Sequence, residues 1–166
     1  MDNKNSGFPT DYGKKTTRGI KGLFNSFKYA FSGFCYCIFG ERNIRIHITA
    51  TMFVLTISPF YDFTKEQYGI LLIVCGLVMA MEMVNTAIEG ICNYICPEYS
   101  EMARIVKDIA AGAVFLTSGI AVVIGVFFFG DIDTIFRIIT FLYNNPAVLV
   151  LLISTLICSA LFIKDR

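Results

Sequence analysis

The chain has 166 residues, of which 55% are hydrophobic and 16% charged, and its formal net charge is +1. This composition indicates an integral membrane protein and excludes an ordinary soluble domain. No block of Lys and Arg suited to tracking phosphates is present, so nucleic-acid binding is not expected.

The first 39 residues predict a tail followed by a surface helix. Residues 1–16 are polar and lack the apolar core of a secretory signal peptide, so we expect a flexible cytoplasmic tail. Across residues 17–39, apolar side chains such as Phe24, Phe27 and Phe31 recur at steps of three and four. This spacing predicts an amphipathic helix lying on the membrane surface.

The next segments predict two membrane spans. Residues 48–61 are short for a span, so the helix must extend back into 42–47, with Arg42 and Arg45 reaching outward to the interface. His47 is interpreted as an interfacial residue beside these arginines. Thr64 and Gln67 have the spacing of a capping box for the second span, expected over 68–93.

The remaining sequence predicts two further spans. Pro97 ends the second span, and Ser100 is the candidate N-cap of the next helix, whose uncharged part covers 109–129. Residues 130–145 are mixed in character and predicted to be interfacial. Asn145 and Pro146 then provide an N-cap and a first helical residue for a fourth span over 146–163.

The distribution of Lys and Arg predicts that both termini are cytoplasmic. With four spans, only Lys65 and Arg137 fall on one side, and the other side carries positions 4, 14, 15, 18, 21, 28, 42, 45, 104, 107, 164 and 166. Positively charged flanks remain in the cytoplasm. The protein is therefore expected in a cytoplasmic membrane as a multi-pass protein.

A polar stripe interrupts the second span. Glu82, Asn85 and Glu89 lie at i, i+3 and i+7, which places them on one helix face, with the two carboxylates about 10 Å apart along the axis. Ionisable residues are costly inside a membrane, which favours a functional role. Two alternatives stay open. The stripe could make purely structural polar contacts between helices of a non-catalytic scaffold. It could also couple protons or ions in a small transporter.

The charged residues at the cytoplasmic rim suit phosphoryl transfer from a nucleotide to a membrane alcohol. Glu41 and Glu89 could hold Mg²⁺, and Lys107 could offset phosphate charge. Glu82, deeper in the membrane, could act as a general base toward a lipid hydroxyl. No P-loop or kinase-type glycine loop occurs in the sequence, so these residues alone do not establish ATP as the donor.

Five motifs together resemble the bacterial diacylglycerol kinase and undecaprenol kinase family. They are FKYAFSG at 27–33, ERNIRIH at 41–47, EMVNTAIEG at 82–90, PEYSE at 97–101 and KDIAAGAV at 107–114. The similarity covers roughly residues 20–129. It implies an all-α membrane kinase domain over 17–129, with a surface helix and three spans, assembled as a homotrimer. Residues 130–166 depart from this pattern, because their predicted interfacial segment and fourth span extend beyond the usual three-span core.

The resemblance also implies the roles of individual residues. Glu82 resembles the catalytic base, Asn85 lies beside it near the substrate, and Glu41 and Glu89 resemble the metal ligands. Residues similar to those around the family's nucleotide are Tyr29, Glu41, Glu89, Glu98, Tyr99, Lys107 and Asp108. The expected reaction uses Mg²⁺ and ATP at the cytoplasmic face of the bacterial inner membrane. ERNIRIH favours undecaprenol over diacylglycerol as the lipid.

Overall fold

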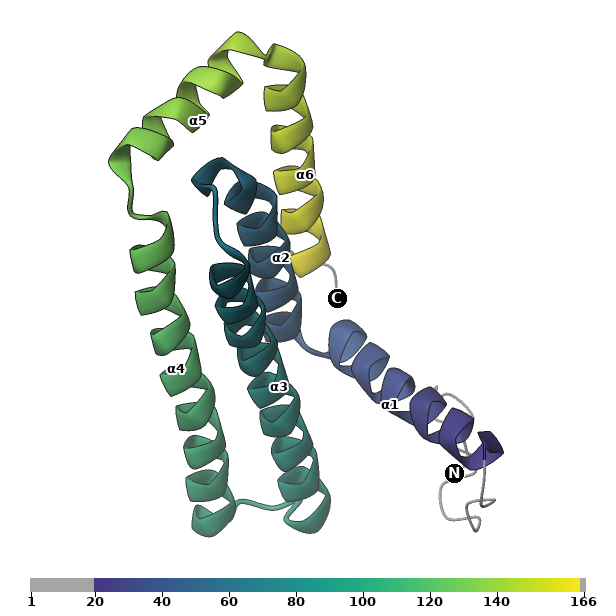
Figure 1. The fold of residues 1–166 in the computed structure, drawn as a ribbon. Helices are drawn as coiled ribbons and strands as arrows, with labels where there is room; N and C mark the ends of the chain where they lie inside the picture. The colour runs from purple at the N-terminus through teal and green to yellow at the C-terminus, as the bar shows by residue number, and fades with distance from the viewer. Residues whose placement is uncertain (1–19, 165–166) are drawn as a thin grey trace. The chain divides into compact units, whose positions relative to one another are not determined.

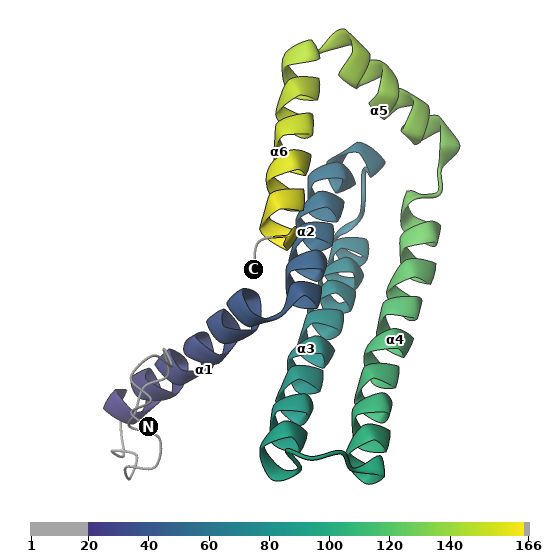
Figure 2. The ribbon, with the colours of Figure 1, turned by 180° about the vertical axis from the view of Figure 1, so that it is seen from behind.

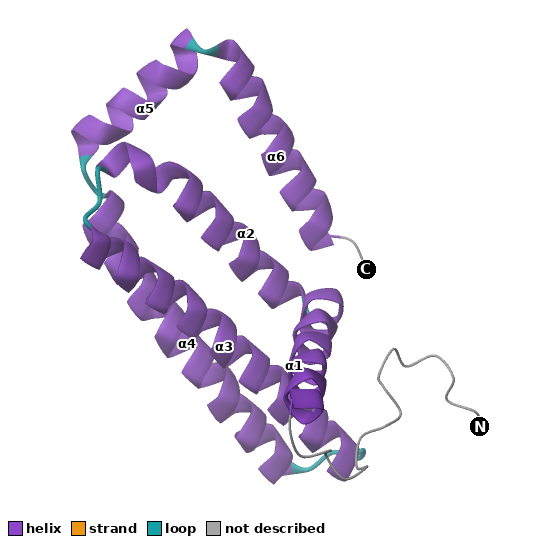
Figure 3. Ribbon diagram, turned by 45° about the vertical axis from the view of Figure 1, so that its right-hand side comes forward, coloured by secondary structure: helices purple, strands orange, loops and turns teal. Residues whose placement is uncertain are grey.

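The computed structural model describes residues 20–164, which are almost entirely helical and contain no β-strand (Figures 1 and 3). The chain divides into two compact units, Met1–Gly40 and Glu41–Arg166, and each is described by itself. In the first unit, the described part is helix α1 (Ile20–Gly40). The predicted surface helix is thereby confirmed as a helix, while the tail at 1–16 and residues 17–19 lie outside the described residues.

The second unit contains four helices that are long and apolar enough to cross a membrane. These are α2 (Arg42–Ile57), which continues into the 3₁₀ helix η1 (Ser58–Tyr61), then α3 (Lys65–Ile95), α4 (Glu101–Phe129) and α6 (Pro146–Lys164). Within residues 20–164, the prediction of four spans is confirmed. Helix α5 (Ile132–Asn144) occupies the segment between α4 and α6, and its interfacial position stays a prediction.

Local side-chain hydrogen bonds define where several helices begin. The capping box at α3 is formed, because the Gln67 N–H donates to Thr64 Oγ1 and the Thr64 N–H donates to Gln67 Oε1. Ser100 caps α4 by accepting from the Ala103 N–H at 3.4 Å. Each of these caps satisfies backbone N–H groups that a helix start leaves without an intrahelical acceptor.

The predicted N-cap position of Asn145 at α6 is confirmed, but its side chain does not take part in the cap. Pro146 is the first helical residue, as expected, and the Asn145 carbonyl accepts from the N–H groups of Val148 and Leu149. The Asn145 side chain, however, donates back to the Phe141 carbonyl at 2.8 Å. Asn145 also ends α5, and its amide satisfies a carbonyl of that preceding helix, so it is used there rather than on α6.

Helices α3 and α4 lie antiparallel and form the most extensive helix contact of the second unit (Figures 1 and 2). Helix α2 packs along α3, and α6 packs along α2. Helix α5 crosses from the end of α4 to the start of α6. Helix α3 therefore lies between α2 and α4, and α2 lies between α3 and α6.

An aromatic cluster fastens the end of the bundle formed by η1, the start of α3 and the end of α4. The Tyr61 hydroxyl donates to the Phe129 carbonyl at 3.1 Å, and the ring of Phe63 lies 5.2 Å from that of Phe129 between centroids. At the same end, a side chain at Gly130 would meet the Val126 carbonyl oxygen at 2.5 Å, so only glycine fits the close turn that ends α4.

The extra helix α6 is held on α2 by a buried arginine. Arg45 is only 5% exposed; its Nη1 donates to the Phe162 carbonyl at 3.0 Å, and its guanidinium lies 5.8 Å from the centre of the Phe162 ring. The expectation that Arg45 reaches outward to the interface is therefore wrong. Carbonyls in the last turn of a helix lack intrahelical donors, and Arg45 supplies one to α6.

Candidate active site

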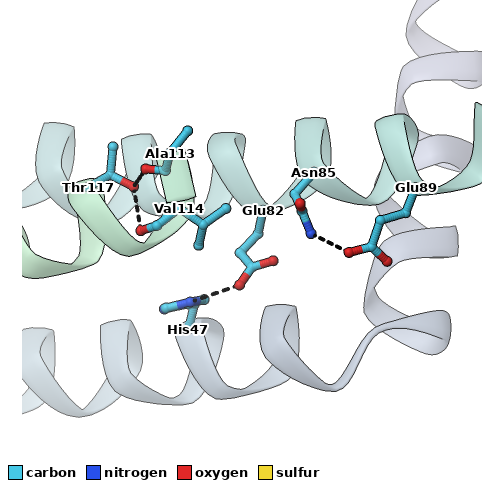
Figure 4. A network of polar contacts seen from close by, with 7 residues as sticks. All are labelled: His47, Glu82, Asn85, Glu89, Ala113, Val114 and Thr117. Carbon is cyan, nitrogen blue, oxygen red and sulfur yellow. Dashed lines mark hydrogen bonds and ion pairs between the residues drawn. The ribbon is translucent and has the colours of Figure 1, made fainter. Parts of the chain in front are cut away.

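The polar stripe predicted on the second span forms one face of α3. Glu82 is 4% exposed and Asn85 is 8% exposed, and Glu89 is half-buried one turn further on (Figure 4). The Asn85 amide donates to Glu89 Oε1 at 2.9 Å. The predicted placement of the three side chains on one face is confirmed. Asn85 is hydrogen-bonded to Glu89, the carboxylate nearer the C-terminal end of the helix.

Glu82 faces α2, where it meets a histidine. His47 Nε2 lies 3.4 Å from Glu82 Oε1, and the two side chains are 24% and 5% exposed (Figure 4). The sequence predicts only an interfacial position for His47 and gives it no part in the site. The contact depends on the rotation of α2 against α3, and the 34 residues between His47 and Glu82 carry no periodic signal that would reveal it.

His47 also stands at the edge of an apolar groove between α2, α3 and α4. The groove has a volume of about 320 Å³, and its walls include Thr51 from α2, Val78 from α3 and Val122 from α4. Its lining is almost wholly hydrocarbon, apart from the imidazole, two hydroxyls and the thiol of Cys75. A groove of this kind suits a hydrocarbon chain whose polar end lies near His47.

Asn85 has an unused acceptor. Its Oδ1 is buried and receives no hydrogen bond within residues 20–164. Asn85 lines a second, smaller hollow of about 240 Å³ between α3 and α4, where Ala110 and Ala113 leave room. Buried acceptors without donors are uncommon in folded proteins, so a donor from a bound molecule would find a matched partner here.

The residues predicted around the nucleotide gather where α3 ends and α4 begins. A hollow of about 360 Å³ is lined there by four of them, namely Glu98, Tyr99, Lys107 and Asp108. The same hollow is lined by Asn93 and Arg104, which the sequence analysis did not single out. The structure therefore brings together most of one predicted group of residues and adds two more polar side chains to it.

Two hydrogen bonds organise this hollow. Lys107 Nζ donates to Asn93 Oδ1 at 2.6 Å, which ties α4 to α3. Arg104 Nη1 donates to Asp108 Oδ2 at 3.2 Å, a spacing of four residues on one helix. The i, i+4 spacing of Arg104 and Asp108 is visible in the sequence, whereas the partnership of Lys107 with Asn93 requires the packing of two helices.

Glu41 and Tyr29 are the remaining predicted site residues. Glu41 is half-buried directly before α2, with an extended backbone, and it makes no hydrogen bond or ion pair with the other predicted site residues in the described chain. Tyr29 lies half-buried on α1, in the first unit, and is described on that helix alone. The pairing of Glu41 with Glu89 around a metal, and the part of Tyr29 at the nucleotide, stay predictions.

A metal ion at this site would need suitable donor atoms. Within residues 20–164, no group of three or more His, Cys, Asp and Glu side chains could hold a metal ion by itself. Mg²⁺ takes few protein carboxylates when phosphate oxygens and water complete its shell. Glu89 fits that requirement, because Asn85 engages only its Oε1 and the structure gives Oε2 no partner among the described residues.

Most of the described chain matches a known protein family. Residues 28–129 match the model of the family described as prokaryotic diacylglycerol kinase. The chain belongs to this family. The matched segment includes the whole of α2, α3 and α4, and therefore the polar stripe, His47 and the hollow at the turn between α3 and α4.

Individual relatives carry two different names. The chain is 36% identical over 104 residues to a diacylglycerol kinase of Synechocystis sp., a match that covers 62% of this chain and 59% of that protein's length. It is 31% identical over 107 residues to the undecaprenol kinase of Bacillus subtilis, covering 64% of this chain and 87% of the relative. The diacylglycerol kinase of Escherichia coli is 26% identical over 107 residues, covering 64% of this chain and 88% of the relative. Helix α6 lies beyond the segment that matches the family model.

Proposed function

We propose that this chain is a lipid kinase, which transfers the γ-phosphoryl group of ATP to the hydroxyl of a membrane lipid. The observation that carries the proposal is the buried carboxylate of Glu82, placed on the family-matched helix α3 beside a residue that edges an apolar groove. A buried carboxylate next to a site for a hydrocarbon chain is suited to removing a proton from an alcohol.

In the proposed reaction, Glu82 takes the proton of the lipid hydroxyl as the hydroxyl oxygen attacks the γ-phosphorus. The bond between the γ-phosphorus and the β–γ bridging oxygen breaks, and ADP leaves with the bond's electron pair. Because the transferred group needs little covalent assistance, most of the rate acceleration would come from positioning and charge stabilisation. Asn85 would hold the carboxylate of Glu89 and offer its free oxygen to a donor near the reacting atoms.

The nucleotide would occupy the hollow between the end of α3 and the start of α4. Lys107 and Arg104 supply positive charge there, and Glu98, Tyr99 and Asp108 complete the polar lining. Glu41 and Glu89 would hold Mg²⁺, which when bound neutralises charge on the phosphate oxygens. Tyr29 would contribute from α1.

The remaining parts of the proposal concern location and assembly. The bias of Lys and Arg supports cytoplasmic termini and a site open to ATP at the cytoplasmic face of a bacterial inner membrane. The family resemblance supports a homotrimer. Undecaprenol is favoured over diacylglycerol because ERNIRIH at 41–47 is closer to the undecaprenol kinase type.

The test offers undecaprenol and diacylglycerol side by side to the purified protein with γ-labelled ATP and Mg²⁺. We expect label in a lipid phosphate, with undecaprenol phosphorylated more efficiently. The Glu82→Gln variant should insert and fold but lose about 10²–10⁴-fold in kcat, the usual contribution of a general base. Glu66→Gln, an exposed carboxylate in the first turn of the same helix, is the matched control and should keep its activity.

Two outcomes would contradict the proposal. Full activity of Glu82→Gln would remove the base assignment. Absence of label in either lipid, together with a proton or ion flux into proteoliposomes without ATP, would replace the kinase by a transporter.

A further inference from the structure

We propose that His47 is a positioning residue for Glu82: it holds the carboxylate in the orientation needed to accept the proton of the lipid hydroxyl. The inference rests on the proposed function, because it gives His47 its role through the base. It stands on the 3.4 Å contact between His47 Nε2 and Glu82 Oε1 and on the low exposure of both side chains (Figure 4).

Glu82 needs a partner because of where it lies. It is 4% exposed on a helix long and apolar enough to cross a membrane, and an unpaired carboxylate in such surroundings is costly. Its neighbour on the stripe, Asn85, is committed to Glu89. Among residues 20–164, the polar partner that the structure gives Glu82 is therefore His47.

The position of His47 suits an orienting role. It comes from α2, whereas Glu82 comes from α3, so the contact fixes the carboxylate against a different helix from its own (Figure 4). His47 also lines the apolar groove between α2, α3 and α4. A hydroxyl at the His47 end of a chain lying in the groove would thus come close to the contact between the imidazole and Glu82, and a misplaced base there would cost about 10²-fold in rate.

The chemistry of the contact defines which replacement should work. An N–H on Nε2 could donate to the carboxylate both in the imidazolium and in the neutral tautomer protonated at Nε2. The Gln side chain offers an amide N–H at a similar reach, whereas Leu fills similar space without a donor. Rescue by Gln therefore separates positioning by an N–H from simple filling of the space between α2 and α3.

The experiment measures kcat and KM for His47→Leu and His47→Gln, with Thr56→Val as control. Thr56 lies on the same helix, but its side chain is exposed and does not line the groove. We expect His47→Leu to lose about 10- to 100-fold in kcat with KM for ATP within about twofold, since the nucleotide hollow is not touched. We expect His47→Gln to remain within about threefold of wild type, and Thr56→Val to be unchanged.

The Glu82→Gln background separates this inference from the proposed function. If His47 acts through Glu82, His47→Leu should have little further effect in Glu82→Gln, so the two losses should not add. An inactive Glu82→Gln with a fully active His47→Leu overturns the positioning role alone. Equal losses in His47→Leu and His47→Gln also overturn it, because the N–H would then be irrelevant. An active Glu82→Gln removes the base and the positioning role together.

Discussion

Lys107 is the basic side chain whose proposed contribution to nucleotide binding can be given a magnitude from the structure. Its Nζ donates to Asn93 Oδ1 at 2.6 Å, across the hollow between α3 and α4. A hydrogen bond to a charged group contributes about 1.5–3 kcal/mol, but the ammonium must exchange Asn93 for a phosphate oxygen, so only part of this is gained on binding. A net of about 1.4 kcal/mol corresponds to a tenfold change.

We therefore expect Lys107→Met to raise KM for ATP about tenfold at saturating lipid, with KM for the lipid unchanged. Met retains most of the apolar stem, so packing against α3 is largely kept. Initial rates with γ-labelled ATP in detergent micelles would measure both constants. The matched control is Asn93→Leu, which releases the ammonium from its partner and should leave KM for ATP unchanged or lower it.

Two results would refute this reasoning. An unchanged KM for ATP in Lys107→Met would mean that the ammonium does not contact the nucleotide. A tenfold increase in Asn93→Leu as well would mean that the Lys107–Asn93 bond matters for holding α3 and α4 together, and that the nucleotide gains nothing from the charge itself.

Two further predictions concern the metal and the extra helix. Glu89→Gln should increase the Mg²⁺ and ATP concentrations needed for half-maximal rate, because one carboxylate charge is lost, and an unchanged Mg²⁺ titration would count against the metal role. Removal of residues 146–166 should lower thermal stability in detergent, because Arg45 loses the Phe162 carbonyl. In an Arg45→Met background, where no buried charge is left behind, the same truncation should lower the free energy of unfolding by about 1.5–3 kcal/mol less. Equal losses of stability in the two backgrounds would contradict this role of Arg45.

Features that depend on short stretches of sequence were predictable. The spans follow from the length of the apolar runs. The caps follow because the side chains of Thr64 and Ser100 each accept a hydrogen bond from the N–H group three residues further along the chain. The shared face of Glu82, Asn85 and Glu89 follows from helix periodicity alone. Each of these predictions uses distances that one helix fixes by itself.

Features that join two helices were not predictable in the same way. His47 meets Glu82, Lys107 meets Asn93, and Arg45 meets Phe162 because α2, α3, α4 and α6 pack with particular rotations and offsets. Several packings are compatible with the same apolar periodicity, since every face of a membrane helix is apolar enough to be buried. The sequence therefore predicts which residues share a face of one helix better than it predicts which residues of another helix they contact.

The unbroken course of α3 has a consequence for insertions and deletions. The helix runs continuously from Lys65 to Ile95, so the axial offset between Glu82 and Glu89 is set by seven peptide units, about 10 Å. One added or removed residue between them would rotate one carboxylate about 100° away from the other and change the offset by about 1.5 Å. The turn at 96–100 carries no such constraint between the two carboxylates. Length changes in that turn would leave the spacing of this pair intact, because α3 alone sets the axial distance between the two carboxylates.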